Sequence, residues 1–229
     1  MSERSVSGPT WLDLYDFRRR MAALYAEREA ALRAGEAEPG PLTRFRAGKD
    51  ELFARHPQSP FEPEELAAFT GLRYFPYDAT LRIEATLTPL AEDEEEESEE
   101  LPASGPHAMR FRRAGRLDFS LAGEPASLLV YWIDVYGGGL FLPFRDATSG
   151  NETYGGGRYL FDTVKGSDYL RLDGERDGGM GYGGGRVLLD FNYAYNPSCA
   201  YDSRWVCPLA PNENRLPMAI RAGERAYHE

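Results

Sequence analysis

Lysine is almost missing from this sequence of 229 residues, and the scarcity narrows what the protein can be. Its lysines are Lys49 and Lys165, so arginine carries nearly all of the positive charge, and the formal net charge is -11. Non-specific nucleic-acid binding requires clustered Lys and Arg that neutralise phosphates. The charge balance therefore predicts no nucleic-acid partner.

Long hydrophobic runs are also missing. The most apolar stretch, residues 127–135, contains Asp134 and fits a buried strand. It is far shorter than the roughly 20 residues that a membrane helix needs. The first ten residues are polar and lack the apolar segment of a signal peptide. We expect a cytoplasmic location and no membrane partner.

The two cysteines are too few for a fold stapled by disulfides. Cys199 and Cys207 lie in a proline-rich stretch, and no histidine is near them in sequence. A zinc site would have to recruit carboxylates or a distant histidine. We interpret the pair instead as two buried thiols, or as a disulfide closing the loop, which act as a structural clasp. The sequence thus predicts no metal and no cofactor.

Helical patterns fill the N-terminal part of the chain. Residues 11–33 carry apolar residues at helical spacing, with a capping box at Thr10 and Asp13. A second helix is predicted over 42–55 and a short helical turn over 63–69. We therefore predict an N-terminal helical region, residues 1–70, that packs on the core of the protein.

From Leu72 onward, alternation of apolar and polar residues replaces the helical pattern. Strands are predicted over 81–87, 109–113, 117–121, 128–136, 140–144, 158–162, 169–172 and 187–192. The strands predicted over 109–113 and 117–121 form a hairpin around Ala114-Gly115. The fold class is mainly β (α+β): an antiparallel β-sandwich or barrel over residues 71–229, preceded by two N-terminal helices.

An acidic run interrupts the strand series. Residues 92–100 hold eight acidic side chains broken by Ser98. The favoured interpretation is a solvated loop insertion over 91–102, and the alternative is a role in binding calcium or a cationic partner.

The string Tyr-Gly-Gly-Gly occurs at Tyr136, Tyr154 and Tyr182, each time followed by a strand-like segment. A phosphate-binding loop would lead into a helix instead. We interpret these glycines as tight turns and bulges.

Polar side chains gather where predicted strands end, which is where binding sites form on a rigid sheet. We take Asp190 as the candidate general base. The candidate ligand-binding residues are Arg145, Asp146, Tyr154, Arg158, Asn192, Tyr195 and Asn196. Arginine forks would hold an anion, and the tyrosines would line the pocket. The alternative is that the charged groups pair internally and the asparagines support turns.

Several of these strings resemble one family. They are Phe-Leu-Pro-Phe-Arg-Asp-Ala-Thr-Ser-Gly from residue 141, Thr-Tyr-Gly-Gly-Gly-Arg-Tyr-Leu from 153, Asp-Phe-Asn-Tyr-Ala-Tyr-Asn-Pro from 190, and Cys-Pro-Leu-Ala-Pro-Asn-Glu-Asn from 207. Together they are similar to the domain-of-unknown-function family numbered 1684, over roughly residues 44–227. The family has no activity that the resemblance could imply for this chain. The polar residues of the family pattern are concentrated over 145–214, which implies a role beyond core packing.

The predicted function is a binding pocket for a small polar or anionic molecule, with hydrolysis as an extension. The alternative is a non-catalytic module for protein interaction or structure. Whether the chain is an enzyme, and its oligomeric state, are left open by the sequence.

Overall fold

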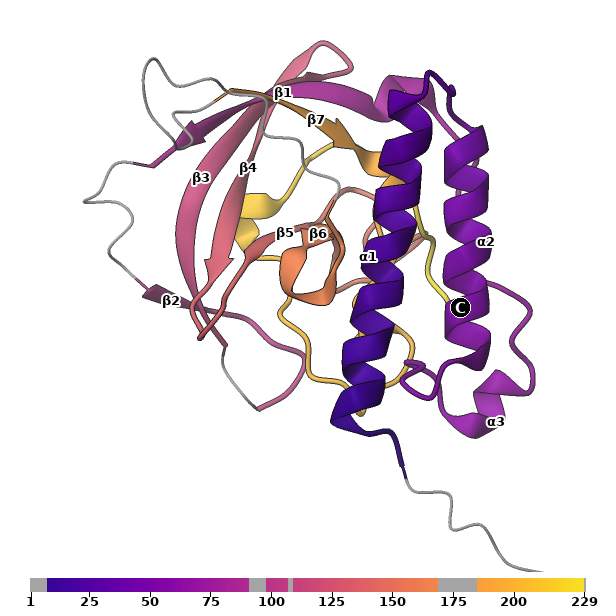
Figure 1. The fold of residues 1–229 in the computed structure, drawn as a ribbon. Coiled ribbons are helices and arrows are strands. Elements are labelled where there is room, and N and C mark those ends of the chain that lie inside the picture. Colours follow the sequence, from indigo (N-terminus) through magenta and orange to yellow (C-terminus); the bar gives the residue numbers. More distant parts are fainter. Residues whose placement is uncertain (1–7, 91–97, 107–108, 169–184, 229) are drawn as a thin grey trace, which may run out of the picture. The chain divides into compact units, whose positions relative to one another are not determined.

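The computed structural model describes residues 8–90, 98–106, 109–168 and 185–228 (Figure 1). The chain divides into two units, Met1–Gly71 and Leu72–Glu229. In the described residues, no helix combines the length and the apolar character needed to cross a membrane.

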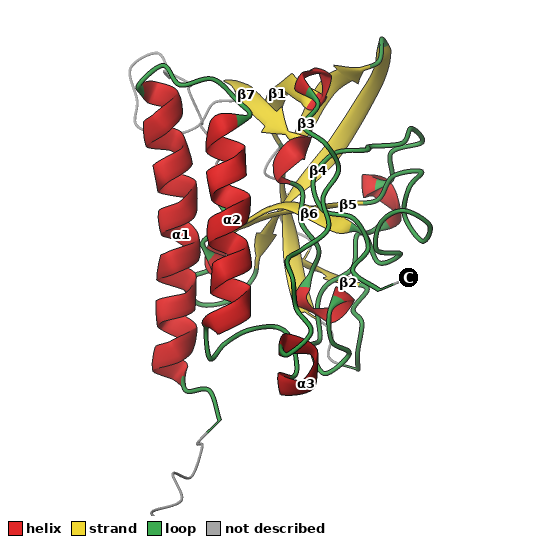
Figure 2. Cartoon of the chain, turned by 90° about the vertical axis from the view of Figure 1, so that its right-hand side faces the viewer, coloured by secondary structure: helices red, strands yellow, loops and turns green. Residues whose placement is uncertain are grey.

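The first unit is helical, as predicted. Its helices are α1 (Trp11–Arg33), α2 (Gly40–Arg55) and α3 (Pro63–Leu66). Helix α1 begins with the predicted capping box, in which the Thr10 side chain and the Asp13 carboxylate each accept a hydrogen bond from the other's backbone N–H. Helices α1 and α2 lie side by side (Figure 2), and the rings of Tyr25 and Phe45 pack with centroids 4.7 Å apart.

In the described residues, the second unit is built on a seven-stranded sheet whose strands pair antiparallel. Its strands are β1 (Arg82–Pro89), β2 (Ser98–Leu101), β3 (Met109–Leu121), β4 (Glu124–Ile133), β5 (Leu140–Phe144), β6 (Arg158–Asp162) and β7 (Gly185–Asp190). The order is β6-β5-β4-β3-β1-β7, and β2 pairs with the first half of β3. The sheet curls into a half-barrel (Figures 1 and 2), which confirms a mainly β fold with N-terminal helices.

Strand β3 corrects the predicted hairpin at Ala114-Gly115. It runs unbroken through these residues, and its pairing with β4 shifts register between Arg113 and Gly115. Such a bulge accommodates an extra residue without a turn. The real turn lies at Ala122-Gly123, where both residues have positive φ, 53° and 87°. Two positive φ values match the twist of a two-residue hairpin.

The acidic run is also different from the prediction where it is described. Residues 98–101 form strand β2 instead of a loop, and Glu99 pairs with Arg113 at 2.8 Å. Leu101 is buried with Phe111 and Tyr131. Residues 91–97 and the predicted strand at 169–172 lie outside the described part of the chain.

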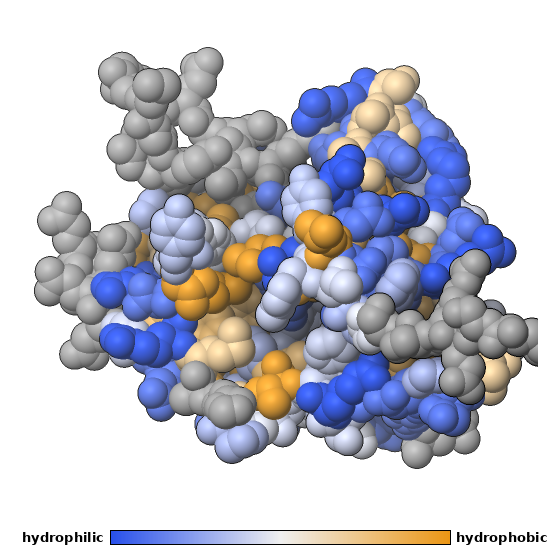
Figure 3. Space-filling model, turned by 60° about the horizontal axis from the view of Figure 1, so that its bottom comes forward, coloured by the Kyte–Doolittle hydropathy of each residue, from blue (hydrophilic) through white to orange (hydrophobic). Residues whose placement is uncertain are grey.

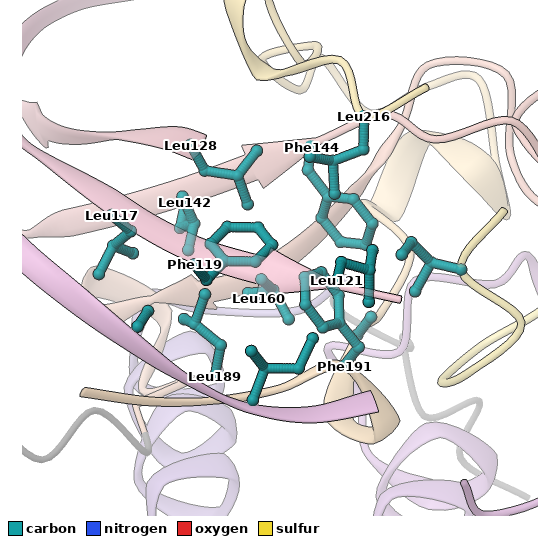
Figure 4. Close-up of a cluster of buried hydrophobic side chains, with 14 of the residues drawn as sticks. Leu117, Phe119, Leu121, Leu128, Leu142, Phe144, Leu160, Leu189, Phe191 and Leu216 are labelled. Carbon is teal, nitrogen blue, oxygen red and sulfur yellow. The ribbon is translucent and has the colours of Figure 1, made fainter. Parts of the chain in front are cut away.

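The main core fills the concave side of the sheet with aliphatic and aromatic side chains (Figure 4). Phe144 from β5 meets Phe191, which follows β7, edge to face with ring centroids 5.3 Å apart. This contact joins β5 to the segment that follows β7, although the two strands are not neighbours in the sheet. The core thereby fixes the ends of β5, β6 and β7, from which the candidate site residues extend.

Three short 3-10 helices follow β7: η3 (Phe191–Tyr193), η4 (Ser198–Ala200) and η5 (Asn212–Asn214). The strand predicted to continue to Asn192 therefore stops at Asp190, whose side chain accepts a hydrogen bond from the Asn192 N–H and caps η3.

Candidate functional site

Arg158 and Asp146 form an ion pair that is closed off from solvent. The Arg158 guanidinium lies 2.8 Å from the Asp146 carboxylate, and neither side chain is more than 1 % exposed. Arg158 also donates hydrogen bonds to the backbone carbonyls of Ile220, Ala222 and Glu224. Burial is the main influence on the pKa of Arg158 and lowers it, while Asp146 opposes this shift. In this arrangement Arg158 fastens the C-terminal segment to β6.

Asp146 is fully engaged by the turn that follows β5. Its carboxylate accepts hydrogen bonds from the Thr148 N–H at 2.7 Å, the Thr148 hydroxyl at 2.5 Å and the Ile220 N–H at 3.3 Å. This is the self-satisfied Asp turn that short polar side chains favour. The contacts match the alternative interpretation, in which the charged groups pair internally.

Asp190 and Asn192 are buried as well. Asp190 has no exposed surface, accepts a hydrogen bond from the Asn192 side chain at 3.0 Å, and lies 3.5 Å from the Arg82 guanidinium. Asn192 exchanges two hydrogen bonds of 2.9 Å with the backbone of Asp78. These bonds hold the segment before β1 against the end of β7.

Tyr195 and Asn196 take part in a second internal network. The Tyr195 backbone pairs with that of Tyr159. Asn196 donates its backbone N–H to the buried Glu224 carboxylate at 2.8 Å, and the Tyr201 hydroxyl donates to the same oxygen at 2.5 Å. Glu224 thus organises the chain on both sides of η4.

Arg145 and Tyr154 differ from the other candidates because both side chains are partly exposed. The structure gives the Arg145 side chain no hydrogen bond or ion pair with any described residue, and its Nε atom is buried without a partner. The Arg145 charge acts on the Tyr154 phenol, whose pKa it works to lower. A guanidinium without a carboxylate partner is suited to receive an anion.

The Tyr154 hydroxyl lies 3.5 Å from Cys199 Sγ, and the Cys199 thiol is hydrogen-bonded to that of Cys207. Both cysteines are free thiols, with Cys207 buried and Cys199 partly exposed. Ser104 lies beside both thiols: its hydroxyl accepts the Cys207 N–H at 2.9 Å, donates to the Trp205 carbonyl at 3.2 Å, and interacts with the Cys199 side chain. We call Cys199, Cys207, Tyr154, Ser104 and Arg145 the Cys199 cluster.

Hydrogen bonds make Cys199 the more acidic of the two thiols. The bond from Cys207 is the largest cause and, with those from the Ser104 and Tyr154 hydroxyls, lowers the pKa of Cys199 to about 6 against the opposing effect of burial. The same bond and burial raise the pKa of Cys207. Burial raises the pKa of Tyr154 too, so its phenol keeps a proton to donate.

Two glycines let the Tyr154 loop pack closely enough to build this cluster. A Cβ on Gly156 would lie 2.4 Å from the Tyr154 ring, and one on Gly157 would lie 2.6 Å from the Phe144 carbonyl oxygen. Gly157 also has a φ of +97°, which L side chains rarely adopt. The Tyr-Gly-Gly-Gly string at 154 therefore serves a turn, as the sequence predicted, and that turn leads into β6.

Sequence reasoning treated the two cysteines as a clasp and did not connect them with Tyr154 or Ser104. Ser104 lies about a hundred residues before Cys207, and their mutual backbone and side-chain hydrogen bonds are tertiary contacts that no local pattern reveals. Among the described residues, no group of three or more His, Cys, Asp or Glu side chains is arranged to hold a metal ion.

The model of the family described as "Protein of unknown function (DUF1684)" matches residues 67–225. The chain belongs to this family. A solved structure is also similar: the solution NMR structure of an uncharacterized protein of Haloarcula marismortui, with 38% sequence identity and a TM-score of 0.56. The similarity covers 82% of this chain and 94% of that one. No curated protein matches the chain. Every residue of the Cys199 cluster lies within the range matched by the DUF1684 family.

Proposed function

We propose that the protein binds a small anionic molecule through Arg145 and exposes it to nucleophilic attack by the Cys199 thiolate. The Tyr154 side chain carries this proposal, because its hydroxyl lies 3.5 Å from the Cys199 sulfur and the Arg145 charge acts to lower its pKa. The anion site at Arg145 and the nucleophile Cys199 therefore both interact with the partly exposed Tyr154. This retains the small anionic ligand predicted from the sequence and changes the residues that act on it.

Cys199, acting as a nucleophile, replaces Asp190, the predicted general base, as the residue that carries the chemistry. A thiolate is the reactive form of cysteine, and the hydrogen bonds that lower the pKa of Cys199 to about 6 favour the thiolate at neutral pH. Asp190 is engaged by Asn192 and Arg82 and has no exposed surface, so it is poorly placed to meet a substrate. Asp146 and Arg158 are likewise paired with each other in a buried ion pair, so they too are poorly placed to meet a substrate.

The chemistry proposed is attack on an electrophilic carbon, such as the carbonyl of an ester or thioester. The Cys199 sulfur forms a bond to that carbon and the leaving group departs, taking a proton from the Tyr154 phenol or from water. Water then hydrolyses the sulfur–carbon bond. A charge-assisted contact from Arg145 to a carboxylate of the substrate would hold the molecule while this happens.

Alkylation of Cys199 by two reagents of similar size and different charge tests the proposal. Iodoacetate is anionic and iodoacetamide is neutral. A charge-assisted hydrogen bond is worth about 1.5–3 kcal/mol, less where solvent screens it, so Arg145→Gln should slow iodoacetate about 10-fold and change iodoacetamide less than about 2-fold. The rates are read on the Cys199 peptide by mass spectrometry.

Arg186→Gln is the matched control, since it removes the same charge from an exposed position on β7, where Arg186 lies 3.9 Å from Glu84. It should leave both rates unchanged. Equal slowing by the two arginine variants would show that only the net charge matters and would exclude an anion site at Arg145. Hydrolysis is tested separately with anionic nitrophenyl esters, and activity that survives Cys199→Ser contradicts the nucleophile.

One observation favours the alternative of an interaction module. Val135 and Tyr136, at the turn after β4, are exposed by 58% and 106%, and Trp132 by 42%. On the face shown in Figure 3, by contrast, polar residues predominate and apolar residues are scattered among them. If the exposed turn joins two copies of the chain, Tyr136→Ser should abolish concentration-dependent sedimentation and Cys199→Ser should not. Sedimentation as a monomer at all concentrations would remove this alternative.

A further inference from the structure

Cys199 and Cys207 are hydrogen-bonded thiols whose environments differ. Cys199 is partly exposed, and its sulfur lies 3.5 Å from the Tyr154 hydroxyl, whereas Cys207 is 3% exposed. An accessible thiol with a buried second thiol at its side is the arrangement in which an oxidised sulfur can be captured within the same chain.

We propose that the pair reduces hydroperoxides, with Cys199 as the attacking sulfur and Cys207 as the resolving one. This inference goes beyond the binding of an anion, because a hydroperoxide is neutral and does not need Arg145. It shares the Cys199 nucleophile and the Tyr154 proton donor with the proposed function.

The first step transfers one oxygen atom. The Cys199 thiolate attacks the terminal oxygen of the hydroperoxide, a sulfur–oxygen bond forms, and the oxygen–oxygen bond breaks. Cys199 becomes a sulfenic acid, and the alkoxide that leaves takes a proton from the Tyr154 phenol or from water. For hydrogen peroxide the product is water. The sulfur is oxidised by two electrons and the peroxide is reduced by two.

The second step closes the disulfide. The Cys207 sulfur attacks the Cys199 sulfur, the new sulfur–sulfur bond replaces the sulfur–oxygen bond, and the hydroxide leaves with the Cys207 proton as water. An external dithiol then returns both sulfurs to thiols by exchange.

The surrounding backbone holds the two sulfurs in place for the second step. Cys207 and Ser104 exchange two hydrogen bonds, from the Cys207 N–H to the Ser104 hydroxyl and from the Ser104 N–H to the Cys207 carbonyl, each 2.9 Å long. The Tyr159 hydroxyl donates to the carbonyl of Pro208, the next residue. Cys199 lies in η4, whose following residues are anchored through the Tyr201 hydroxyl to Glu224.

Hydrogen bonds, and not the charged groups nearby, favour ionisation of Cys199 over Cys207. In the described part of the chain, Lys165 acts to lower the pKa of Cys207, Arg145 acts on Tyr154, and Asp162 acts on Tyr159. At pH 6 about half of Cys199 is a thiolate, against roughly 0.3% of an ordinary thiol. Lower basicity reduces the intrinsic reactivity of a thiolate but by less than the gain in ionised fraction, so Cys199 should react faster than a free cysteine at this pH.

The experiment uses the reduced full chain, one equivalent of hydrogen peroxide at pH 6, and peptide mass spectrometry. We expect an intrachain Cys199–Cys207 disulfide, with the mass falling by two hydrogen atoms. In Cys207→Ser, dimedone should trap a sulfenic acid on Cys199, and in Cys199→Ser the Cys207 thiol should survive. With dithiothreitol supplied, the wild-type chain should consume peroxide over many turnovers and Cys199→Ser should not.

Three results would overturn the inference: thiols that survive one equivalent of peroxide, Cys199 oxidised to a sulfinic acid while Cys207 stays reduced, or disulfides that form only between chains. The wild-type measurement stands without any variant, so a variant that fails to fold does not affect it. The two proposals fail separately, because the iodoacetate rate reports the anion site at Arg145, whereas the intrachain disulfide formed by the wild-type chain reports the cysteine pair.

Discussion

Breaking the buried Arg158–Asp146 pair should destabilise the fold far more than breaking an exposed pair. Arg158→Met leaves the Asp146 carboxylate in a site where its side chain is 1% exposed, and it also removes the donor to three backbone carbonyls. Loss of one partner of a buried ion pair typically costs about 3–5 kcal/mol. Total stabilities are roughly 5–15 kcal/mol, so this variant should be close to unfolding.

Urea unfolding followed by circular dichroism measures the effect. Asp118→Asn is the matched control, because Asp118 pairs with Arg116 at 3.0 Å on β3 with both side chains 43% exposed or more, and an exposed pair contributes about 0–1 kcal/mol. Arg158→Met combined with Asp146→Leu should recover part of the loss, since no uncompensated charge is then buried. A cost below about 1 kcal/mol for Arg158→Met would refute the structural role and return Arg158 to the list of ligand-binding candidates.

Three further changes test other parts of the structure. Gly157→Ala should lower the free energy of unfolding by about 2–4 kcal/mol, because the new Cβ adds overlap with the β5 backbone to the strain of a positive φ. Gly123→Ala is the control, because Gly123 also has a positive φ but no atom lies within 4 Å of its added Cβ, and it should cost only about 1–2 kcal/mol. Equal costs of the two variants in urea unfolding would contradict the packing argument. Leu101→Ala should cost about 2–5 kcal/mol, because β2 buries this side chain, and a negligible loss would mean that the acidic run is dispensable after all. Tyr154→Phe removes a hydrogen bond to the Cys199 sulfur and should shift the pH midpoint of Cys199 alkylation upward, so an unchanged midpoint would show that the phenol does not stabilise the thiolate.

The regular elements of the fold were predictable because their signals are local. Helix α1 has the predicted bounds, Trp11–Arg33, since its capping box and apolar spacing are both written in adjacent residues. Strands β5 and β6 also match, at Leu140–Phe144 and Arg158–Asp162, because the glycine triplets mark where each begins. The family resemblance was confirmed by the match over residues 67–225.

The errors arose where tertiary contacts outweigh local chemistry. Ala114-Gly115 resembles a turn, yet Gly115 continues β3 because its missing Cβ allows close approach to the Thr88 carbonyl, 3.0 Å from where that atom would be. Residues 98–101 resemble a solvated loop, yet pairing with β3 and the buried Leu101 make them a strand.

For the candidate site, the sequence predicted which residue types gather there and not how their side chains are paired. The sequence predicted that arginine, aspartate, asparagine and tyrosine gather at strand ends, but it did not show which groups they pair with. Arg158 is satisfied by carbonyls more than sixty residues away, whereas Arg145, in the same sequence region, has no partner among the described residues. Which arginine is free to bind a ligand depends on that difference, and only the three-dimensional structure supplies it.

The ionisation of Cys199 tests the central claim most directly. The rate of iodoacetamide labelling is measured between pH 4 and pH 10, with the Cys199 and Cys207 peptides quantified separately by mass spectrometry. Labelling of Cys199 should rise with a midpoint at about pH 6, because hydrogen bonds from Cys207, Ser104 and Tyr154 stabilise its thiolate, while Cys207 should stay unlabelled until the protein unfolds. A Cys199 midpoint near the ordinary cysteine value of about 8.5 would contradict the account of a nucleophilic thiolate site.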